Sequence, residues 1–233
     1  MTRSLTDLKN AFSGKKGVIV ANGPSTKSID FDVLKASNAI TFASNRVSLL
    51  YESTSWRPHF YVCFAVGPLK HKEWRESIER AVENESTTCF VPESFKSFLP
   101  VQDNIVFVDN VSEHYRHDPV PDNLFDISPE DHFLKSFSAT VPMFQLCLYT
   151  GVKNIAIVGQ DGYQSDREEN HFSKDYGFPP TDFKKVNKRI KDVHHVLKKY
   201  ADREKVSVHN LSKISILDEY PVVEIQQFIR SRN

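Results

Sequence analysis

The sequence lacks several features that would assign it to a large functional class. Thirty basic residues are balanced by thirty acidic residues, so no excess of positive charge favours binding to nucleic acid. No window contains the ~20 consecutive apolar residues that a membrane-spanning helix needs. The first residues contain no long apolar core, so we expect no signal peptide. We therefore expect a cytoplasmic protein with no nucleic-acid partner and no transmembrane segment, and we leave peripheral association with a membrane open.

Cysteine is scarce as well. Cys63, Cys89 and Cys147 are scattered along the chain, and each lies beside apolar residues. No Cys-x-x-Cys spacing is present, which argues against a zinc site or a redox motif. The three residues are typical of buried thiols in a protein of a reducing compartment.

Common motifs of nucleotide-dependent enzymes are also missing. The chain has neither GxGxxG nor GxxxxGK[ST], which argues against dinucleotide oxidoreductases and P-loop NTPases. No Asp-x-Asp pair follows a predicted strand, although such a pair is usual in metal-dependent nucleotide-sugar transferases. Asp161 with Asp166, Glu168 and Glu169 could bind magnesium, but a run of carboxylates is more often a solvated face. We therefore predict no metal ligand and no cofactor.

The sequence does contain short apolar strands that alternate with helical patterns. Predicted strands cover residues 17–21, 39–43, 59–64, 88–91, 104–108, 154–158 and 206–208. Helical patterns cover residues 5–13, 70–84, 138–150, 181–203 and 221–231. Such alternation predicts βαβ units and an α/β fold with a mostly parallel, Rossmann-like sheet flanked by helices. We expect a single domain over 1–233, with a core at about 15–215 and a loop-rich insertion at about 110–136.

The first predicted strand runs into a turn of small residues. Asn22, Gly23, Pro24 and Ser25 break the strand, because glycine tolerates backbone angles closed to other residues and proline lacks an N–H. If a helical turn follows Ser25, its free amides form a site suited to phosphate. An ordinary connection between a strand and a helix is the alternative interpretation.

Polar residues also follow other predicted strands. Ligands of doubly wound sheets bind beyond the carboxyl ends of the strands. We therefore expect one cleft from the polar clusters Asn22–Ser25, Asn45-Arg46, Asp161–Tyr163 and Asn210–Ser212. His171 lies in the polar loop after the strand at 154–158 and can accept a proton from a hydroxyl nucleophile, although a solvated surface histidine is the alternative. We interpret His194-His195 as surface or packing detail.

Six segments of the chain, taken in order, resemble the DUF115 (MptE-like) family. They are Asn22–Ser25, Phe42–Val47, Thr54–Val62, Ser138–Thr140, Ile157–Asp161 and His171–Tyr176. That family is allied to the small bacterial sialyltransferases and the motility-accessory-factor flagellin glycosyltransferases, and it includes archaeal 6-hydroxymethylpterin diphosphokinases. The resemblance implies a modified GT-A type, Rossmann-like transferase fold with a nucleotide bound across the strand ends.

The resemblance also implies roles for individual residues. In the sialyltransferase relatives, a CMP-activated nonulosonic acid is transferred with inversion and without a metal. By this resemblance His171 is the predicted base, and Tyr163 and Tyr176 are predicted to lie near the departing phosphate. The residues predicted to bind the nucleotide or the sugar are Asn22, Gly23, Pro24, Ser25, Asn45, Arg46, Ser138, Thr140, Gln160 and Asp161.

These features favour a glycosyltransferase that moves a sugar from a CMP-linked donor to a surface glycan or polysaccharide. The alternative is a magnesium-dependent pyrophosphokinase of the 6-hydroxymethylpterin type, in which Asp161 and the acidic residues after it would be metal ligands. A nucleotide-binding module without catalytic activity is a third reading. An oligomer is compatible with each of them.

Overall fold

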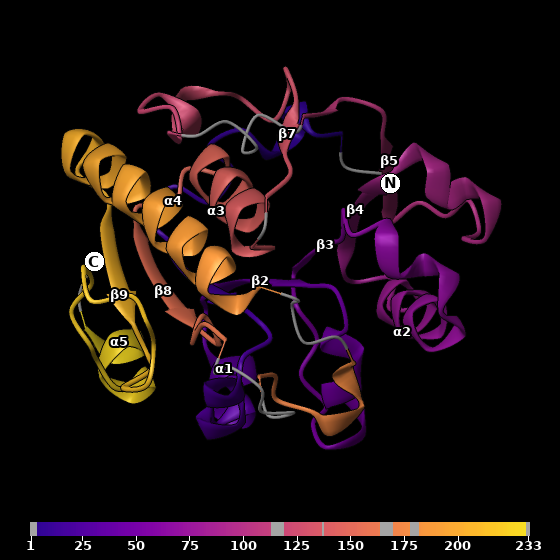
Figure 1. The fold of residues 1–233 in the computed structure, drawn as a ribbon, viewed down its shortest axis with the longest axis horizontal. Coiled ribbons are helices and arrows are strands. Elements are labelled where there is room, and N and C mark those ends of the chain that lie inside the picture. The colour runs from indigo at the N-terminus through magenta and orange to yellow at the C-terminus, as the bar shows by residue number, and fades with distance from the viewer. Residues whose placement is uncertain (1–3, 113–118, 137, 164–169, 178–181, 232–233) are drawn as a thin grey trace.

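A seven-stranded sheet forms the centre of the protein (Figure 1), whose computed structural model describes residues 4–112, 119–136, 138–163, 170–177 and 182–231. Its strands are β1 Lys16–Val20, β2 Ile40–Ser44, β3 Phe60–Val62, β4 Thr88–Pro92, β5 Ile105–Val108, β8 Asn154–Val158 and β9 Ser207–Asn210. All neighbouring strands in this sheet pair in parallel. The predicted α/β fold with a parallel sheet is therefore confirmed.

The strand order reverses beside β1. The sheet reads β5-β4-β3-β2-β1-β8-β9, so the chain builds outward from β1 in one direction and then adds β8 and β9 on the other side. A reversal of this kind leaves a crevice at the carboxyl ends of the two central strands, because their following loops leave in opposite directions. The pair β1 and β8 is therefore where a ligand site is expected.

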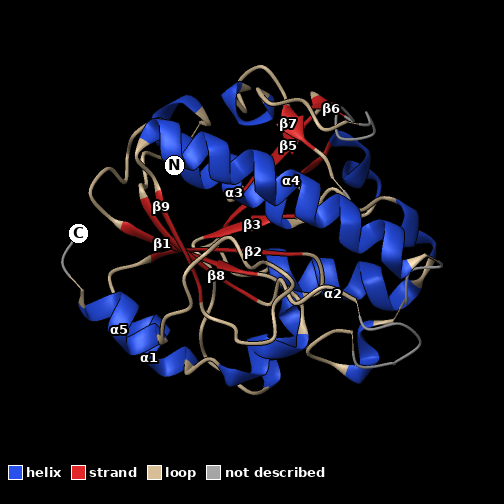
Figure 2. Cartoon of the chain, turned by 60° about the vertical axis from the view of Figure 1, so that its left-hand side comes forward, coloured by secondary structure: helices blue, strands red, loops and turns tan. Residues whose placement is uncertain are grey.

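Helices cover both faces of the sheet (Figure 2). The helices α1 Phe31–Ala36, α2 Lys72–Val82 and α5 Ile225–Arg230 lie on one face, and α3 Thr140–Tyr149 and α4 Phe183–Glu204 lie on the other. Successive side chains of a strand point to opposite faces. In β1, Ile19 therefore packs with the α3 and α4 core, whereas Val18 and Val20 pack with the other core. Burial on both faces explains the continuous apolar pattern of the predicted strands.

Short elements connect these layers. The 3₁₀ turns are η1 Thr6–Leu8, η2 Pro24–Ser28, η3 Val47–Glu52, η4 Gly67–Lys70, η5 Glu93–Ser97, η7 Leu124–Asp126 and η8 Lys174–Tyr176. The helix predicted over 5–13 is wrong, because only η1 forms and Asn10 turns the backbone left-handed at φ 58. Within the predicted insertion, β6 Val111–Ser112 pairs in parallel with β7 Phe133–Leu134.

The cysteine side chains and the lengths of the helices also bear on the sequence analysis. Cys63, Cys89 and Cys147 are buried free thiols, as predicted. Throughout the part of the chain that the structure describes, every helix is too short or too polar to cross a membrane.

Candidate active site at the carboxyl ends of β1 and β8

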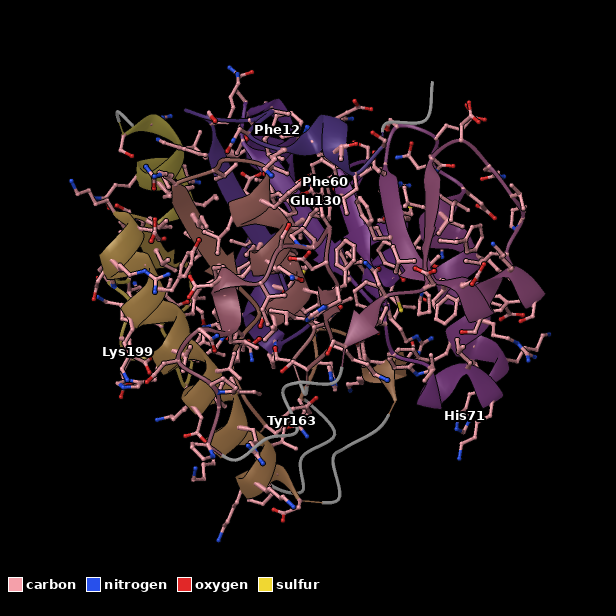
Figure 3. All side chains as sticks on the ribbon, turned by 90° about the horizontal axis from the view of Figure 1, so that it is seen from above. Phe12, Phe60, His71, Glu130, Tyr163 and Lys199 are labelled. Carbon is pink, nitrogen blue, oxygen red and sulfur yellow. The ribbon has the colours of Figure 1, made fainter. Side chains whose placement is uncertain are left out.

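A cavity of ≈ 80 Å³ lies where the strand order reverses. Tyr163, one of the residues that line it, lies at the opposite end of the sheet from Phe12 and Phe60 (Figure 3). The predicted site residues that line the cavity are Asn22, Gly23, Asn45, Ser138, Thr140, Gln160, Tyr163, His171 and Tyr176. Most of the predicted site thus converges on one place, although the segments come from distant parts of the chain.

The carboxylate of Asp161 is buried behind this cavity and links neighbouring loops by hydrogen bonds. Its Oδ2 accepts a hydrogen bond from the Ser25 amide at 2.7 Å, and its Oδ1 accepts from the hydroxyls of Ser25 at 2.7 Å and Ser212 at 2.8 Å. The Asp161 side chain thereby joins the loops after β1, β8 and β9. The amides that we expected to be free for phosphate at the turn after Ser25 are already used at its start, because the Ser25 amide donates to Asp161 and the Thr26 amide donates to the carbonyl of Gly23. Pro24 and Ser25 instead line a separate surface groove.

Gly23 is required for the close approach of the β1 and β8 loops. Its amide donates to the carbonyl of Gly159 at 2.7 Å. A Cβ atom at Gly23 would lie 2.5 Å from both that carbonyl oxygen and Oδ2 of Asp161. Gly159 itself has a φ of +77°, a conformation that favours glycine. The glycines of the two loops therefore serve backbone packing at the floor of the cavity.

Asn22 presents an unsatisfied polar atom at the cavity. Its side chain is 8% exposed, and its Nδ2 donates to Oγ of Ser44 at 3.2 Å. Its Oδ1 is buried and has no hydrogen-bond partner among the residues that the structure describes. Leaving a buried acceptor unpaired costs about 1–3 kcal/mol. Because phosphate oxygens are also acceptors, this oxygen suits a hydroxyl or an amino group of a ligand.

Asn45 and Arg46 follow β2 and have different roles. Asn45 lines the cavity with a left-handed backbone, φ 53, and its carbonyl accepts a bond from the Tyr61 hydroxyl at 2.7 Å. The Arg46 guanidinium is buried and donates to the backbone carbonyls of Asp175 and Tyr176. Arg46 therefore holds the η8 turn in place and does not line the cavity.

An aromatic cluster closes the cavity on the side of η8. The imidazole of His171 stacks on the Tyr176 ring with 3.8 Å between centroids, and the Tyr163 ring meets it edge-on at 5.6 Å. Burial, and then the charge of Arg46, lowers the pKa of His171 to about 4. Burial raises the pKa of both tyrosines. At neutral pH the cavity therefore offers one neutral imidazole, which can accept a proton, and two phenols, which can donate hydrogen bonds.

Two asparagines that the sequence analysis did not select help to build the site. The side chain of Asn187 in α4 holds the backbone of Tyr163 through two hydrogen bonds. The Tyr163 amide donates to Oδ1 of Asn187 at 2.9 Å, and Nδ2 of Asn187 donates to the Tyr163 carbonyl at 2.9 Å. Asn170 is 3% exposed and lines the cavity beside His171. Asn187 lies three residues before the buried Ile190, so helical spacing could have placed it on the inner face of α4.

Ser138 and Thr140 lie at the start of α3. The Ser138 Oγ lies 2.8 Å from Oε1 of Gln160 and 2.6 Å from Oγ1 of Thr140. The cavity borders a second one of ≈ 130 Å³, which shares Asn45 and Ser138 with it and extends toward β3. The two cavities therefore form parts of one polar-to-apolar crevice along the strand ends.

Charged side chains are scarce around the cavity. The described residues that line the ≈ 80 Å³ cavity include no Asp, Glu, Lys or Arg, whereas Lys135 lines the adjoining cavity. Among the magnesium ligands considered above, Asp166, Glu168 and Glu169 lie outside the described residues, and Asp161 already accepts three hydrogen bonds. In the described part of the chain, no group of three or more His, Cys, Asp or Glu side chains is arranged to hold a metal ion.

Comparisons with known proteins give a structural likeness only. No protein-family model matches the sequence, and no curated protein matches it. The sialyltransferase CstII from Campylobacter jejuni, in complex with the substrate analogue cytidine-5'-monophosphate, is 14% identical with a TM-score of 0.51, over 95% of this chain and 88% of that chain. The α-2,3-sialyltransferase Cst-I from Campylobacter jejuni is 16% identical with a TM-score of 0.49, over 94% of this chain and 83% of that chain.

The likeness to CstII shows that the two chains share a fold. It agrees with the sialyltransferase part of the sequence resemblance, whereas no family model supports the DUF115 part. At 14% identity it does not extend to the substrates. The chemistry of this chain therefore has to be argued from its own residues.

Proposed function

We propose that the chain is a glycosyltransferase that transfers a sugar from a CMP-linked donor to a hydroxyl of a glycan, without a metal and with inversion. The observation that carries this proposal is the cluster of His171, Tyr163 and Tyr176 at the point where the strand order reverses. The fold shared with a sialyltransferase that was crystallised with CMP supports the choice of donor. A nonulosonic or sialic-type acid is the proposed sugar, and a surface polysaccharide made on the cytoplasmic side is the proposed acceptor.

The cluster suits a single displacement step. Neutral His171 takes the proton of the acceptor hydroxyl as the hydroxyl oxygen bonds to the anomeric carbon. The bond between that carbon and the phosphate oxygen breaks, and its electrons leave with CMP. Tyr163 and Tyr176, which stay protonated, donate hydrogen bonds to the departing phosphate. The proton on His171 then passes to water, and the configuration at the anomeric carbon is inverted.

The size of the cavity implies that donor binding rearranges the aromatic cluster. Volumes of ≈ 80 and ≈ 130 Å³ fall below the ~300–1,000 Å³ typical of small-molecule pockets. The stacked His171 and Tyr176 rings line the cavity, and we propose that this stack shifts when the donor binds. In this proposal, contacts of each ring with the donor replace the contact between the His171 and Tyr176 rings.

A lining with no described carboxylate and a single described lysine, Lys135, favours a sugar phosphodiester over a nucleoside triphosphate. A CMP-linked nonulosonic acid carries one charge on its phosphate and one on its carboxylate, and hydroxyl and amide donors can bind both. A triphosphate carries several charges and is normally bound with Mg²⁺ and cationic side chains. The described residues that line the ≈ 80 Å³ cavity include neither a carboxylate for the metal nor a lysine or arginine for the phosphates, and those of the adjoining cavity add one lysine, Lys135, and no carboxylate.

The role of His171 is tested by His171→Ala. If the imidazole is the base, turnover at saturating donor should fall by ~10²–10⁴-fold while the Kd for CMP stays near the wild-type value. His195→Ala, at an exposed histidine of α4, is the matched control and should leave turnover unchanged. Wild-type turnover in His171→Ala would remove this residue from the mechanism.

The donor class is tested by thermal shift with CMP, CDP, UDP, GDP and ATP, each with and without Mg²⁺. A ligand at 100 times its Kd stabilises the folded state by about 2.7 kcal/mol, so the preferred nucleotide should give the largest shift. We expect CMP to rank first, with a shift that EDTA does not change. A shift given only by ATP with Mg²⁺ would contradict the proposal and would favour phosphoryl transfer.

A further inference from the structure

A buried chain of hydrogen bonds connects α4 with the edge of the cavity. Oγ1 of Thr140, which lies 2.6 Å from Oγ of Ser138, is also 3.5 Å from Nε2 of His194. Nδ1 of His194 lies 3.1 Å from the hydroxyl of Tyr220. At the other end, Ser138 contacts Oε1 of Gln160 at 2.8 Å. All five residues are at least nine-tenths buried, but only Ser138, Thr140 and Gln160 line the cavity.

The direction of the donors along this chain follows from the number of protons available. Oε1 of Gln160 can only accept, so the single hydroxyl proton of Ser138 points to it. Ser138 must then accept from the Thr140 hydroxyl, and Thr140 in turn accepts from His194. His194 therefore carries its proton on Nε2, and its bare Nδ1 shares the Tyr220 hydroxyl proton with the backbone carbonyl of His194, which accepts from that hydroxyl at 3.2 Å.

His194 is suited to fix this direction because it stays neutral. Burial lowers the pKa of His194 to about 3, and its ring packs edge-on against Phe144 and Tyr220 at 5.7 and 5.8 Å. A neutral imidazole has one donor and one acceptor nitrogen, so a proton on Nε2 leaves Nδ1 to accept from Tyr220. His194 thus accepts a hydrogen bond from Tyr220 at Nδ1 and donates one to Thr140 from Nε2.

The far end of the chain determines what Gln160 offers to a ligand. With Oε1 held by Ser138, the carboxamide turns its Nε2 away from Ser138, and within the described residues that nitrogen makes no hydrogen bond. Gln160 lines the cavity with two N–H donors still unused. We propose that His194 is a positioning residue that fixes this chain and so presents the Gln160 amide to the ligand phosphate, an inference that rests on the proposed function for the identity of the ligand.

The first test compares the affinities for CMP and cytidine by calorimetry. Gln160→Glu replaces the two donors with an anionic acceptor, so binding of CMP should weaken by about 10- to 100-fold, the range for a hydrogen bond to a charged group. Cytidine lacks the phosphate, and its affinity should change little. Equal weakening of both ligands would overturn the assignment of Gln160 to the phosphate.

The second test breaks the chain away from the ligand. Thr140→Val and His194→Phe should each weaken CMP by about 3- to 10-fold, the effect of one neutral hydrogen bond, with little change for cytidine. His194→Gln can place an N–H near the former Nε2 and should restore most of the CMP affinity. His195→Gln, on the exposed side of α4, is the matched control and should match the wild type. Wild-type CMP affinity in Thr140→Val would overturn the proposal.

A third measurement needs no ligand. The ¹⁵N chemical shifts of histidine distinguish the two neutral tautomers, and the His194→Gln variant assigns the signal. We expect the Nε2–H form of His194 in the wild type, and an Nδ1–H form would overturn the proposal whatever the ligand is. If the wild type binds no CMP, the proposed function fails, while the tautomer still decides the direction of the chain.

Discussion

Replacing Asp161 with asparagine should remove much of the stability of the protein. The carboxylate accepts three hydrogen bonds in a site where it is 3% exposed. If the new amide nitrogen faces the Ser25 amide, one charge-assisted bond of ~1.5–3 kcal/mol is lost and a buried N–H is left unpaired at ~1–3 kcal/mol. If it faces the hydroxyls of Ser25 and Ser212, both lose their acceptor. Asp161→Asn should therefore lower the free energy of unfolding by about 3–5 kcal/mol.

Urea denaturation followed by far-UV circular dichroism measures this change. With a slope of about 2–3 kcal/mol per molar urea for a chain of this size, the midpoint should fall by about 1–2 M. Asp175→Asn is the matched control, because its side chain is exposed and the change should stay within about 0.5 kcal/mol. A midpoint for Asp161→Asn equal to that of Asp175→Asn would refute the view that this carboxylate ties the three loops together.

Three further results are expected. Arg46→Met removes the bonds to the η8 carbonyls, so turnover should fall at least ~10-fold in a protein that still melts cooperatively; unchanged turnover would separate η8 from catalysis. Folding lowers the pKa of His171 to about 4 and that of His194 to about 3. Below about pH 6.5 the unfolded state therefore binds more protons than the folded state, and the free energy of unfolding should fall as the pH drops toward 4. A urea midpoint that is equal at pH 7 and pH 5 would contradict this. Trp74 packs edge-on against Tyr176 at 5.6 Å, so CMP should change tryptophan fluorescence in the wild type and leave the signal of Trp74→Phe unchanged.

Much of the sheet could be predicted because burial on both faces leaves a simple mark in the sequence. The β8 strand was predicted at its observed bounds, and its continuous run of apolar residues is typical of a strand buried on both faces. The helix expected over 5–13 failed because three apolar residues at helical spacing do not outweigh the left-handed turn at Asn10. Local patterns therefore predict elements that are buried and long better than those that are short and exposed.

The sequence could not show which of the site residues hold the loops together and which face the cavity. Ser25 and Asp161 both follow strands and both look like ligand contacts, yet they bond to each other across 136 positions of sequence. Nothing local distinguishes them from Asn22, whose Oδ1 has no hydrogen-bond partner among the described residues. His194 was interpreted together with His195 as surface or packing detail, without a distinction between the two. Its spacing of four residues from the buried Ile190 was the signal that places it on the inner face of α4.

The described residues that line the ≈ 80 Å³ cavity carry no formal charge, and this has a consequence for binding in salt. An anion held by lysine or arginine loses affinity as ionic strength rises, because mobile ions screen the attraction. Here the available donors are phenols, hydroxyls and amides, whose short-range dipoles are screened far less. The Kd for CMP should therefore change less than about twofold between low and physiological salt. Selectivity at such a site depends on the fit of hydrogen-bond donors and acceptors more than on the total charge of the nucleotide.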